Sequence, residues 1–63
     1  LPAGAEGTVD PAMQEKLTAQ LVKEGYEVRK VQMEDGLLEA YAVKDGKTHE
    51  MYFDKDLKEV KKN

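Results

Sequence analysis

The chain has 63 residues, of which 37% are charged, a formal net charge of −3 and no cysteine. The acidic balance argues against binding to nucleic acid, which attracts surfaces rich in lysine and arginine, and no apolar run approaches the roughly 20 residues of a membrane-spanning helix. Because the chain can form neither a disulfide nor a thiolate metal site, its stability must come from one small core or from a partner.

The first residues show no periodic apolar pattern and contain Pro2, Gly4 and Gly7. We therefore expect a flexible tail over residues 1–9 and a single domain over residues 10–63. The chain starts with "LPAGAEG" and not with methionine, which is typical of a mature protein after removal of a signal peptide, or of a chain that was cut there. The first alternative predicts a periplasmic or secreted protein.

An Asp-Pro pair at positions 10–11 predicts the start of a helix, because the aspartate can cap the free amides and a proline at the first helical position needs no N–H. An apolar stripe with helical spacing follows, formed by Met13, Leu17 and Leu21. Gly25 supplies the left-handed residue that commonly follows a helix. The helix is therefore expected over residues 11–24, with one face to bury.

Alternating apolar and polar residues then predict three strands, over residues 26–34, 37–44 and 47–54. Asp-Gly pairs separate them at 35–36 and 45–46, and each pair favours a two-residue type I′ hairpin turn. With both turns in place, the apolar residues counted outward from them share one face of the sheet. A slip of one residue would move them to the solvent side, so this agreement supports the register.

Two segments depart from this regular pattern. Tyr26 and Val28 are out of step with the alternation of Val31 and Met33, so a regular strand would place them on the outer face. A bulge near residues 29–30 would return them to the inner face. In the C-terminal segment we expect Val60 to pair opposite Met51 as a short fourth strand, with lysines protecting the sheet edge.

The predicted fold class is α+β, with one N-terminal helix packed on a three- to four-stranded antiparallel meander in the order α-β-β-β-(β). Ala40 and Ala42 lie in the middle of the predicted sheet, where small side chains let the helix approach closely. The expected core consists of Leu17, Leu21, Val28, Val31, Met33, Leu38, Met51 and Phe53.

The helix and the stretch "EGYEVRKVQMEDGLLEAYAVKDGKTHEMYFDKDLKEV" resemble the PepSY domain family over roughly residues 11–61. The shared features are Gly25-Tyr26 at the helix end, the alternation around Glu39, the turn Lys44-Asp45-Gly46-Lys47 and a strand that ends in Asp54. The resemblance implies an exported, non-catalytic module, found in propeptides of secreted metallopeptidases and as small free-standing proteins, that binds or restrains a peptidase. Asp56-Leu57 departs from the Asp-Gly that family members often have in the last turn.

Enzymatic chemistry has little support in the sequence. Without serine or cysteine, a Ser/Cys-His-Asp arrangement is excluded by composition. His49-Glu50 begins like the zinc-protease motif H-E-x-x-H, but the fifth position is Phe53, and the motif needs a helix where this segment alternates as a strand. We expect His49 to be structural, at the rim of the helix-facing side, and we predict no enzyme, no catalytic residue and no cofactor.

Asp54, Asp56 and Glu59 carry the alternative function, because carboxylate oxygens suit calcium or another hard cation. The segment lacks the third acidic position and the central glycine of an EF-hand loop, and Lys55 and Lys58 interrupt it. A solvated turn is therefore the favoured interpretation, and an acidic metal-ion or small-ligand binding protein is the alternative.

The outer face of the predicted sheet carries the candidate site. The register places its side chains in rows, formed by Gln32, Glu39 and Tyr52, by Lys30, Tyr41 and Glu50, and by Val43 and Thr48. A single helix covers only one side of a sheet, so either water or a partner covers the other, and tyrosines are favoured at interfaces. We predict partner-binding residues Lys30, Tyr41, Glu50 and Tyr52, with a protein such as a peptidase, or a second copy of the chain, as the partner.

Overall fold

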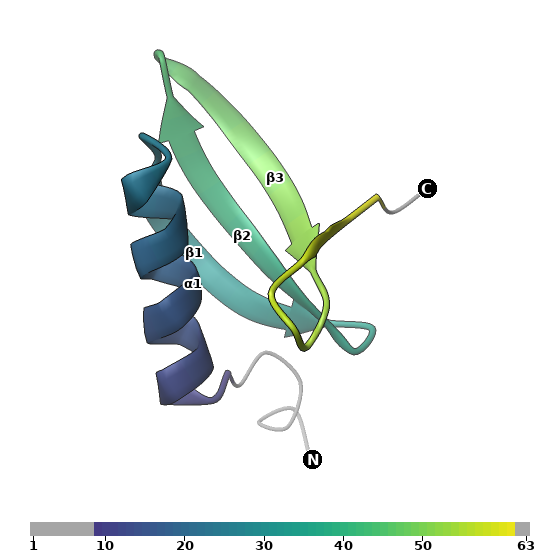
Figure 1. Cartoon of the computed structure of the whole chain (residues 1–63). Helices are drawn as coiled ribbons and strands as arrows, with labels where there is room; N and C mark the ends of the chain where they lie inside the picture. Colours follow the sequence, from purple (N-terminus) through teal and green to yellow (C-terminus); the bar gives the residue numbers. More distant parts are fainter. Residues whose placement is uncertain (1–8, 62–63) are drawn as a thin grey trace.

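The computed structural model describes residues 9–61, which form one helix followed by a four-stranded antiparallel sheet (Figure 1). The elements are α1 (Pro11–Lys23), β1 (Glu27–Glu34), β2 (Leu37–Lys44), β3 (Lys47–Phe53) and β4 (Glu59–Val60). The strands lie in the order β1-β2-β3-β4, so the predicted α+β meander is confirmed. Within residues 9–61, no helix is long and apolar enough to cross a membrane. Most of the predicted tail, residues 1–8, lies outside the described residues, and Val9 packs against the core.

The helix begins and ends where its capping residues predict. The Asp10 side chain accepts a hydrogen bond of 3.0 Å from the Ala12 N–H, and Pro11 occupies the first position. Glu24 caps the other end, and Gly25 follows with a φ of 97°, a left-handed conformation that side chains resist.

Both Asp-Gly pairs form the predicted turns. Asp35, Gly36, Asp45 and Gly46 all have positive φ, between 53° and 80°, as type I′ turns require. The resulting register pairs Ala40 with Val31 on one side and with Met51 on the other. The predicted bulge is confirmed between Val28 and Lys30. The strands therefore show the predicted apolar face to the helix.

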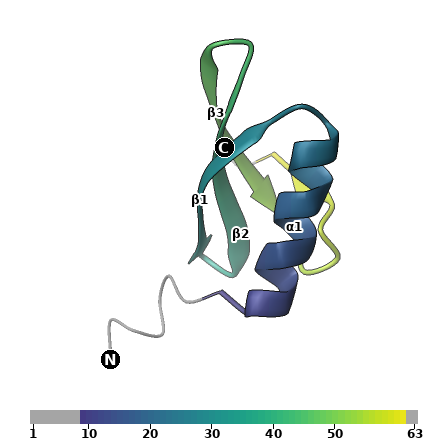
Figure 2. The same cartoon turned by 90° about the vertical axis from the view of Figure 1, so that its left-hand side faces the viewer.

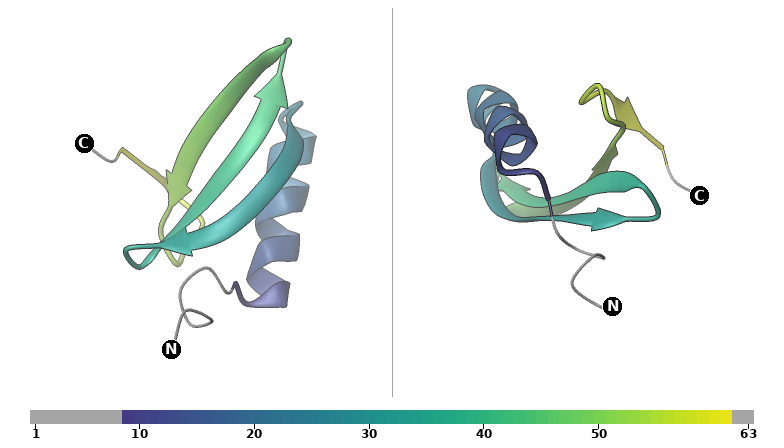
Figure 3. Two further views of the ribbon diagram at one scale, coloured as in Figure 1. Left: turned by 180° about the vertical axis from the view of Figure 1, so that it is seen from behind. Right: turned by 90° about the horizontal axis from the view of Figure 1, so that it is seen from below.

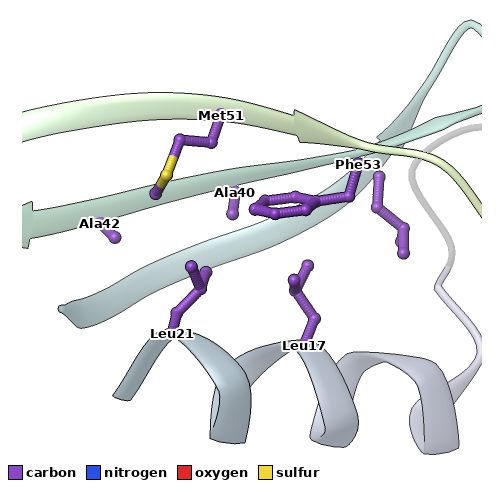
Figure 4. Packing of buried hydrophobic residues seen from close by; sticks show 7 residues of the cluster. Leu17, Leu21, Ala40, Ala42, Met51 and Phe53 are labelled. Atoms are coloured by element: carbon purple, nitrogen blue, oxygen red, sulfur yellow. The ribbon is translucent and has the colours of Figure 1, made fainter. Parts of the chain in front are cut away.

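The core lies between α1 and the inner face of the sheet (Figure 2). Leu17 and Leu21 point from the helix toward Ala40, Ala42 and the ring of Phe53 (Figure 4). The fully or nearly buried apolar residues are Leu17, Leu21, Leu38, Ala40, Ala42, Met51 and Phe53. Tight packing of the helix thus depends on the two small alanines beneath it.

The three predicted core residues on β1, Val28, Val31 and Met33, are half-buried and pack against the core without being enclosed by it. Strand β1 lies at the edge of the sheet and has a neighbouring strand on one side only. Its side chains therefore lack the second flanking row that encloses the residues of β2.

The predicted pairing of Val60 with Met51 is wrong, because Val60 pairs with Tyr52. The loop before β4 is closed by a hydrogen bond from the Asp54 N–H to the Lys58 carbonyl, and Leu57 occupies the left-handed region with a φ of 63°. A three-residue loop with its last residue in this conformation is common, whereas the predicted register needed a two-residue loop. Val60 therefore shares a face with Tyr52.

Candidate functional site

The outer face of the sheet is left uncovered within residues 9–61. Helix α1 and the loop between β3 and β4 lie on the same side of the sheet, and the other side is open in the views from behind and from below (Figure 3). The pairings place Glu39 between Gln32 and Tyr52, and Tyr41 between Lys30 and Glu50, as the sequence predicted. This open face is the candidate site.

Glu39 is the centre of the open face, and its side chain is fully buried. Its Oε1 accepts a hydrogen bond of 2.9 Å from Nε2 of Gln32 on β1, and its Oε2 accepts one of 3.1 Å from the hydroxyl of Tyr52 on β3. A buried carboxylate is tolerable only with such partners. Glu39 thus ties the three longest strands together from their polar side.

The Tyr52 hydroxyl lies between two carboxylates, because it is also 2.9 Å from Oε2 of Glu50. The Tyr41 hydroxyl donates to the same Glu50 oxygen over 3.3 Å. A hydroxyl has one proton, so Tyr52 can donate to Glu39 or to Glu50 at any moment, but not to both. Glu39 and Glu50 therefore compete for the Tyr52 proton.

These contacts set the protonation states of the face. Burial raises the pKa of Glu39, but the hydrogen bonding that Glu39 shares with Glu50, Gln32 and Tyr41 outweighs burial and lowers the pKa to about 2. Hydrogen bonding to Glu39, then burial and the nearby negative charges, raise the pKa of Tyr41 to about 12. The pKa of Tyr52 is raised still further, by its hydrogen bond to Glu50 first and by burial second. At neutral pH both tyrosines are therefore protonated donors and Glu39 is an anion.

The predicted partner-binding residues lie together on this face. Tyr41 and Tyr52 converge on Glu50, and Lys30 is exposed beside Tyr41 in the register. The residue that sequence reasoning missed is Glu39, which it placed in the right row without recognising its burial. The available signal was its position on the central strand, flanked by an amide and a phenol that can both donate hydrogen bonds.

His49 lies on the other side of the sheet, opposite Ala42 and at the rim of the helix-facing side. Its ring packs edge-on against Tyr26 with centroids 5.5 Å apart, and Nζ of Lys44 lies 4.9 Å from the centroid of Tyr26. Because neighbouring residues of a strand point to opposite faces, Glu50 belongs to the open face and cannot act with His49 at one metal. His49 thus lies at the rim, as predicted, and its ring packs against Tyr26 there.

Asp54 organises the loop before β4. Its Oδ1 accepts hydrogen bonds from the backbone N–H groups of Asp56, at 2.8 Å, and Lys58, at 3.0 Å. Among residues 9–61, no three acidic or histidine side chains gather as a metal site, and the structure does not bring Asp54, Asp56 and Glu59 together. The cation site stays a prediction, tested by calorimetric titration with calcium of the chain and of its Asp54→Ala variant.

Comparison with known proteins bears on the whole chain. A family model described as peptidase propeptide and YPEB domain, PepSY_2, matches residues 3–63. No curated protein and no solved structure matches the chain. Domains of this family are propeptide-like, peptidase-related modules that are generally non-catalytic and typically extracellular or periplasmic. The match confirms the resemblance seen in the strand and turn pattern.

Proposed function

This chain belongs to the PepSY family of peptidase propeptide domains, and from that premise we propose that it is a non-catalytic exported module that binds and restrains a secreted or periplasmic peptidase. The contact surface in this proposal is the open sheet face, with Lys30, Tyr41, Glu50 and Tyr52 arranged around Glu39. The observation that carries the proposal is the buried Glu39 carboxylate, which holds a polar network in place on a face that no other described element covers.

The network fixes its tyrosines before any partner arrives. The Tyr52 hydroxyl is held between Glu39 and Glu50, and the Tyr41 hydroxyl is held by Glu50. Ordering flexible side chains on binding costs about 0.5–1.5 kcal/mol for each rotamer-rich side chain, so side chains that are already fixed favour association. Two oriented tyrosines on the open face of the sheet are therefore suited to contact a protein.

The exposed Glu50 carboxylate indicates the chemistry of the contact. Glu50 shares the single Tyr52 proton with the buried Glu39, so a partner that supplies N–H donors completes the hydrogen bonding of Glu50. Hydrogen bonds from lysine or arginine to carboxylates are charge-assisted and roughly twice as strong as neutral ones. We therefore expect a basic or amide-rich patch on the peptidase.

The same groups are poorly suited to catalysis. The raised pKa values of Tyr41 and Tyr52 keep both phenols protonated at neutral pH, where they are weak nucleophiles. Glu39 is buried and already accepts two hydrogen bonds, so it is not available as a general base. These properties support a binding role.

The test uses purified secreted metallopeptidases and a fluorogenic peptide substrate. Wild type should bind and slow hydrolysis, and the Tyr41→Ala/Tyr52→Ala double variant should bind at least about tenfold more weakly, because interface tyrosines commonly dominate affinity. The matched control is Val22→Ala, which alters an exposed side chain on the helix and should behave as wild type. Equal inhibition by wild type and the double variant would remove the open face from the proposal.

A second copy of the chain is the competing occupant of the same face. Sedimentation velocity of wild type and of the double variant separates the two cases. A dimer that dissociates in the double variant would assign the face to self-association and overturn the peptidase proposal.

A further inference from the structure

Strand β3 has a free edge over most of its length. It pairs with β2 along the whole of Lys47–Phe53, but on its other side β4 pairs only with Tyr52 and Phe53. In Figure 3 the part of β3 away from β4 forms the border of the sheet, and in Figure 1 β4 leaves the sheet at an angle. Among residues 9–61, nothing pairs with residues 47–51 on that side.

The register shows which backbone groups point outward. Lys44 and Lys47 close a two-residue turn, so they exchange backbone hydrogen bonds, and the pattern alternates along β3. Thr48 and Glu50 therefore direct their N–H and C=O groups away from β2. Asp54 follows Thr48 and Glu50 at the same spacing of two, so its N–H also points away from β2. This N–H donates a hydrogen bond to the Lys58 carbonyl. Thr48 and Glu50 are both exposed, so their outward groups are accessible.

We propose that this edge takes up an extended segment of the partner as an added antiparallel strand along residues 47–51, in line with β4. The inference rests on the proposed function, because the added strand belongs to the same protein that contacts the open face. Strand addition is a common mode of peptide recognition, in which backbone hydrogen bonds give affinity and alternate side chains give specificity. The short β4 leaves both outward-facing residues available for it.

Charge and burial define the segment that fits. A side chain opposite Glu50 would lie on the open face beside the carboxylate, where arginine or lysine is favoured. Its neighbours in the added strand would point to the inner face, beside the half-buried His49 and the buried Met51, where apolar side chains are favoured. A hollow lies where β4 diverges from β3, and its lining includes the acidic residues Glu50 and Glu59 and the basic Lys61. The fitting segment alternates basic and apolar residues.

A second copy of this chain fits the edge less well. Pairing β3 with its own copy would place the two Glu50 side chains on one face of a continuous sheet, at opposite or diagonal positions. Like charges at such positions are destabilising, and each chain has a net charge of −3. A basic segment from another protein is therefore the occupant to which we commit.

The first test uses a synthetic probe, the capped peptide Val-Arg-Val-Arg-Val, with isotope-labelled protein. Binding should shift the amide resonances of Thr48 and Glu50 and slow their hydrogen exchange, and a peptide with glutamate in place of arginine should bind at least about tenfold more weakly. N-methylation of the peptide amides that face β3 should weaken binding to a similar extent, and N-methylation of the alternate amides should not. Equal effects of both methylation patterns, or no saturable binding up to millimolar peptide, would overturn the inference.

The second test changes the edge itself. Thr48→Pro removes an N–H that points away from β2, and proline is tolerated on an edge strand in that orientation. It should lower probe affinity about fivefold to tenfold, which corresponds to the loss of one hydrogen bond to the added strand. The matched Thr48→Val variant keeps the N–H and should bind as wild type. Glu50→Lys should reverse the preference from the arginine peptide to the glutamate peptide. If Thr48→Pro does not fold, the methylated peptides and the Glu50→Lys variant still test whether the edge takes up a strand.

The two proposals fail in distinguishable ways. If Thr48→Pro inhibits a peptidase as wild type does while Tyr41→Ala/Tyr52→Ala does not, the open-face function stands and strand addition is wrong. If the chain binds no peptidase yet takes up the probe as predicted, the edge site stands and the peptidase proposal is wrong. A dimer of wild type that Thr48→Pro dissociates would assign the edge to a second copy and overturn the basic segment.

Discussion

The two sides of strand β2 bury their residues for opposite reasons. Toward the helix, Ala40 and Ala42 are enclosed by apolar side chains, whereas on the other side Glu39 is enclosed to the same extent by hydrogen-bond donors. Removal of apolar surface from water stabilises the first side, and this term has no preferred direction. The second side depends on directional bonds that fix where each oxygen points. The inner side therefore provides stability, and the open side provides a defined arrangement of polar groups.

The largest expected effect comes from truncating a helix side chain that is buried on the inner side. Leu17→Ala should lower the free energy of unfolding by about 2–5 kcal/mol, because it removes buried methyl groups and leaves a cavity above Ala40. A domain of this size has only about 5 kcal/mol or less to lose, so the variant should be largely unfolded at room temperature. Urea unfolding followed by circular dichroism measures this loss.

The matched control lies on the same helix. Val22 is 56% exposed, and Val22→Ala should change stability by no more than about 0.5 kcal/mol. If Leu17→Ala were as stable as Val22→Ala, the inner side would not be the source of stability, and the contrast between the two sides would disappear.

The next effect tests whether the open side is more than a solvated face. Glu39→Ala should cost about 1–3 kcal/mol, because the Gln32 amide loses its acceptor and Tyr52 loses one of its two. Glu39→Gln keeps the shape and one acceptor, so it should cost less. Urea unfolding of both variants checks the order. An open side with no structural role would instead give Glu39→Ala the stability of wild type.

The difference between the two sides also shows how far the sequence could predict this molecule. The alternating residues and the two Asp-Gly turns predicted the register of three strands, including the row that contains Glu39, because a period of two determines which face a side chain occupies. A period does not determine exposure. Glu39 is buried because Gln32 and Tyr52 on neighbouring strands reach over it, which depends on three side chains at once.

The pairing of β4 was mispredicted for a different physical reason. Leu57 has a φ of 63°, a conformation that costs a residue with a side chain roughly 1–2 kcal/mol, so propensity alone argues against it. The loop adopts it because Leu57 packs against the core, the Asp54 side chain accepts two backbone N–H groups and Gln20 Nε2 donates to the Leu57 carbonyl over 3.3 Å. Tertiary contacts therefore determine the register of β4.

A smaller effect follows from that loop, which packs on the inner side. Leu57→Ala should be destabilising, because it loses the packing and keeps the left-handed backbone. Leu57→Gly loses the same packing but relieves the backbone, so it should be more stable than Leu57→Ala by about 1 kcal/mol. Thermal unfolding of the two variants measures the difference. The opposite order would show that Leu57 is not strained and that the loop has another conformation in solution.

Titration of Glu39 and Tyr41 on the open side has the smallest expected effect on stability at neutral pH. It is also the effect most specific to this side. The pKa of Glu39 falls from 4.5 to about 2 on folding, so its contribution to stability is complete above pH 4.5 and is lost as the pH falls toward 2. The pKa of Tyr41 rises from 10 to about 12, so that contribution is complete below pH 10 and is lost as the pH rises through 12. Thermal unfolding across the pH range, with tyrosinate absorbance to follow the phenols, measures both losses of stability.

Glu39→Gln should abolish the loss of stability at acidic pH. It should also move the alkaline loss to a lower pH, because the anion that raises the pKa of Tyr41 is gone. The inner side contains no such groups among its buried residues, so an unchanged profile in Glu39→Gln would mean that the open-side network does not form.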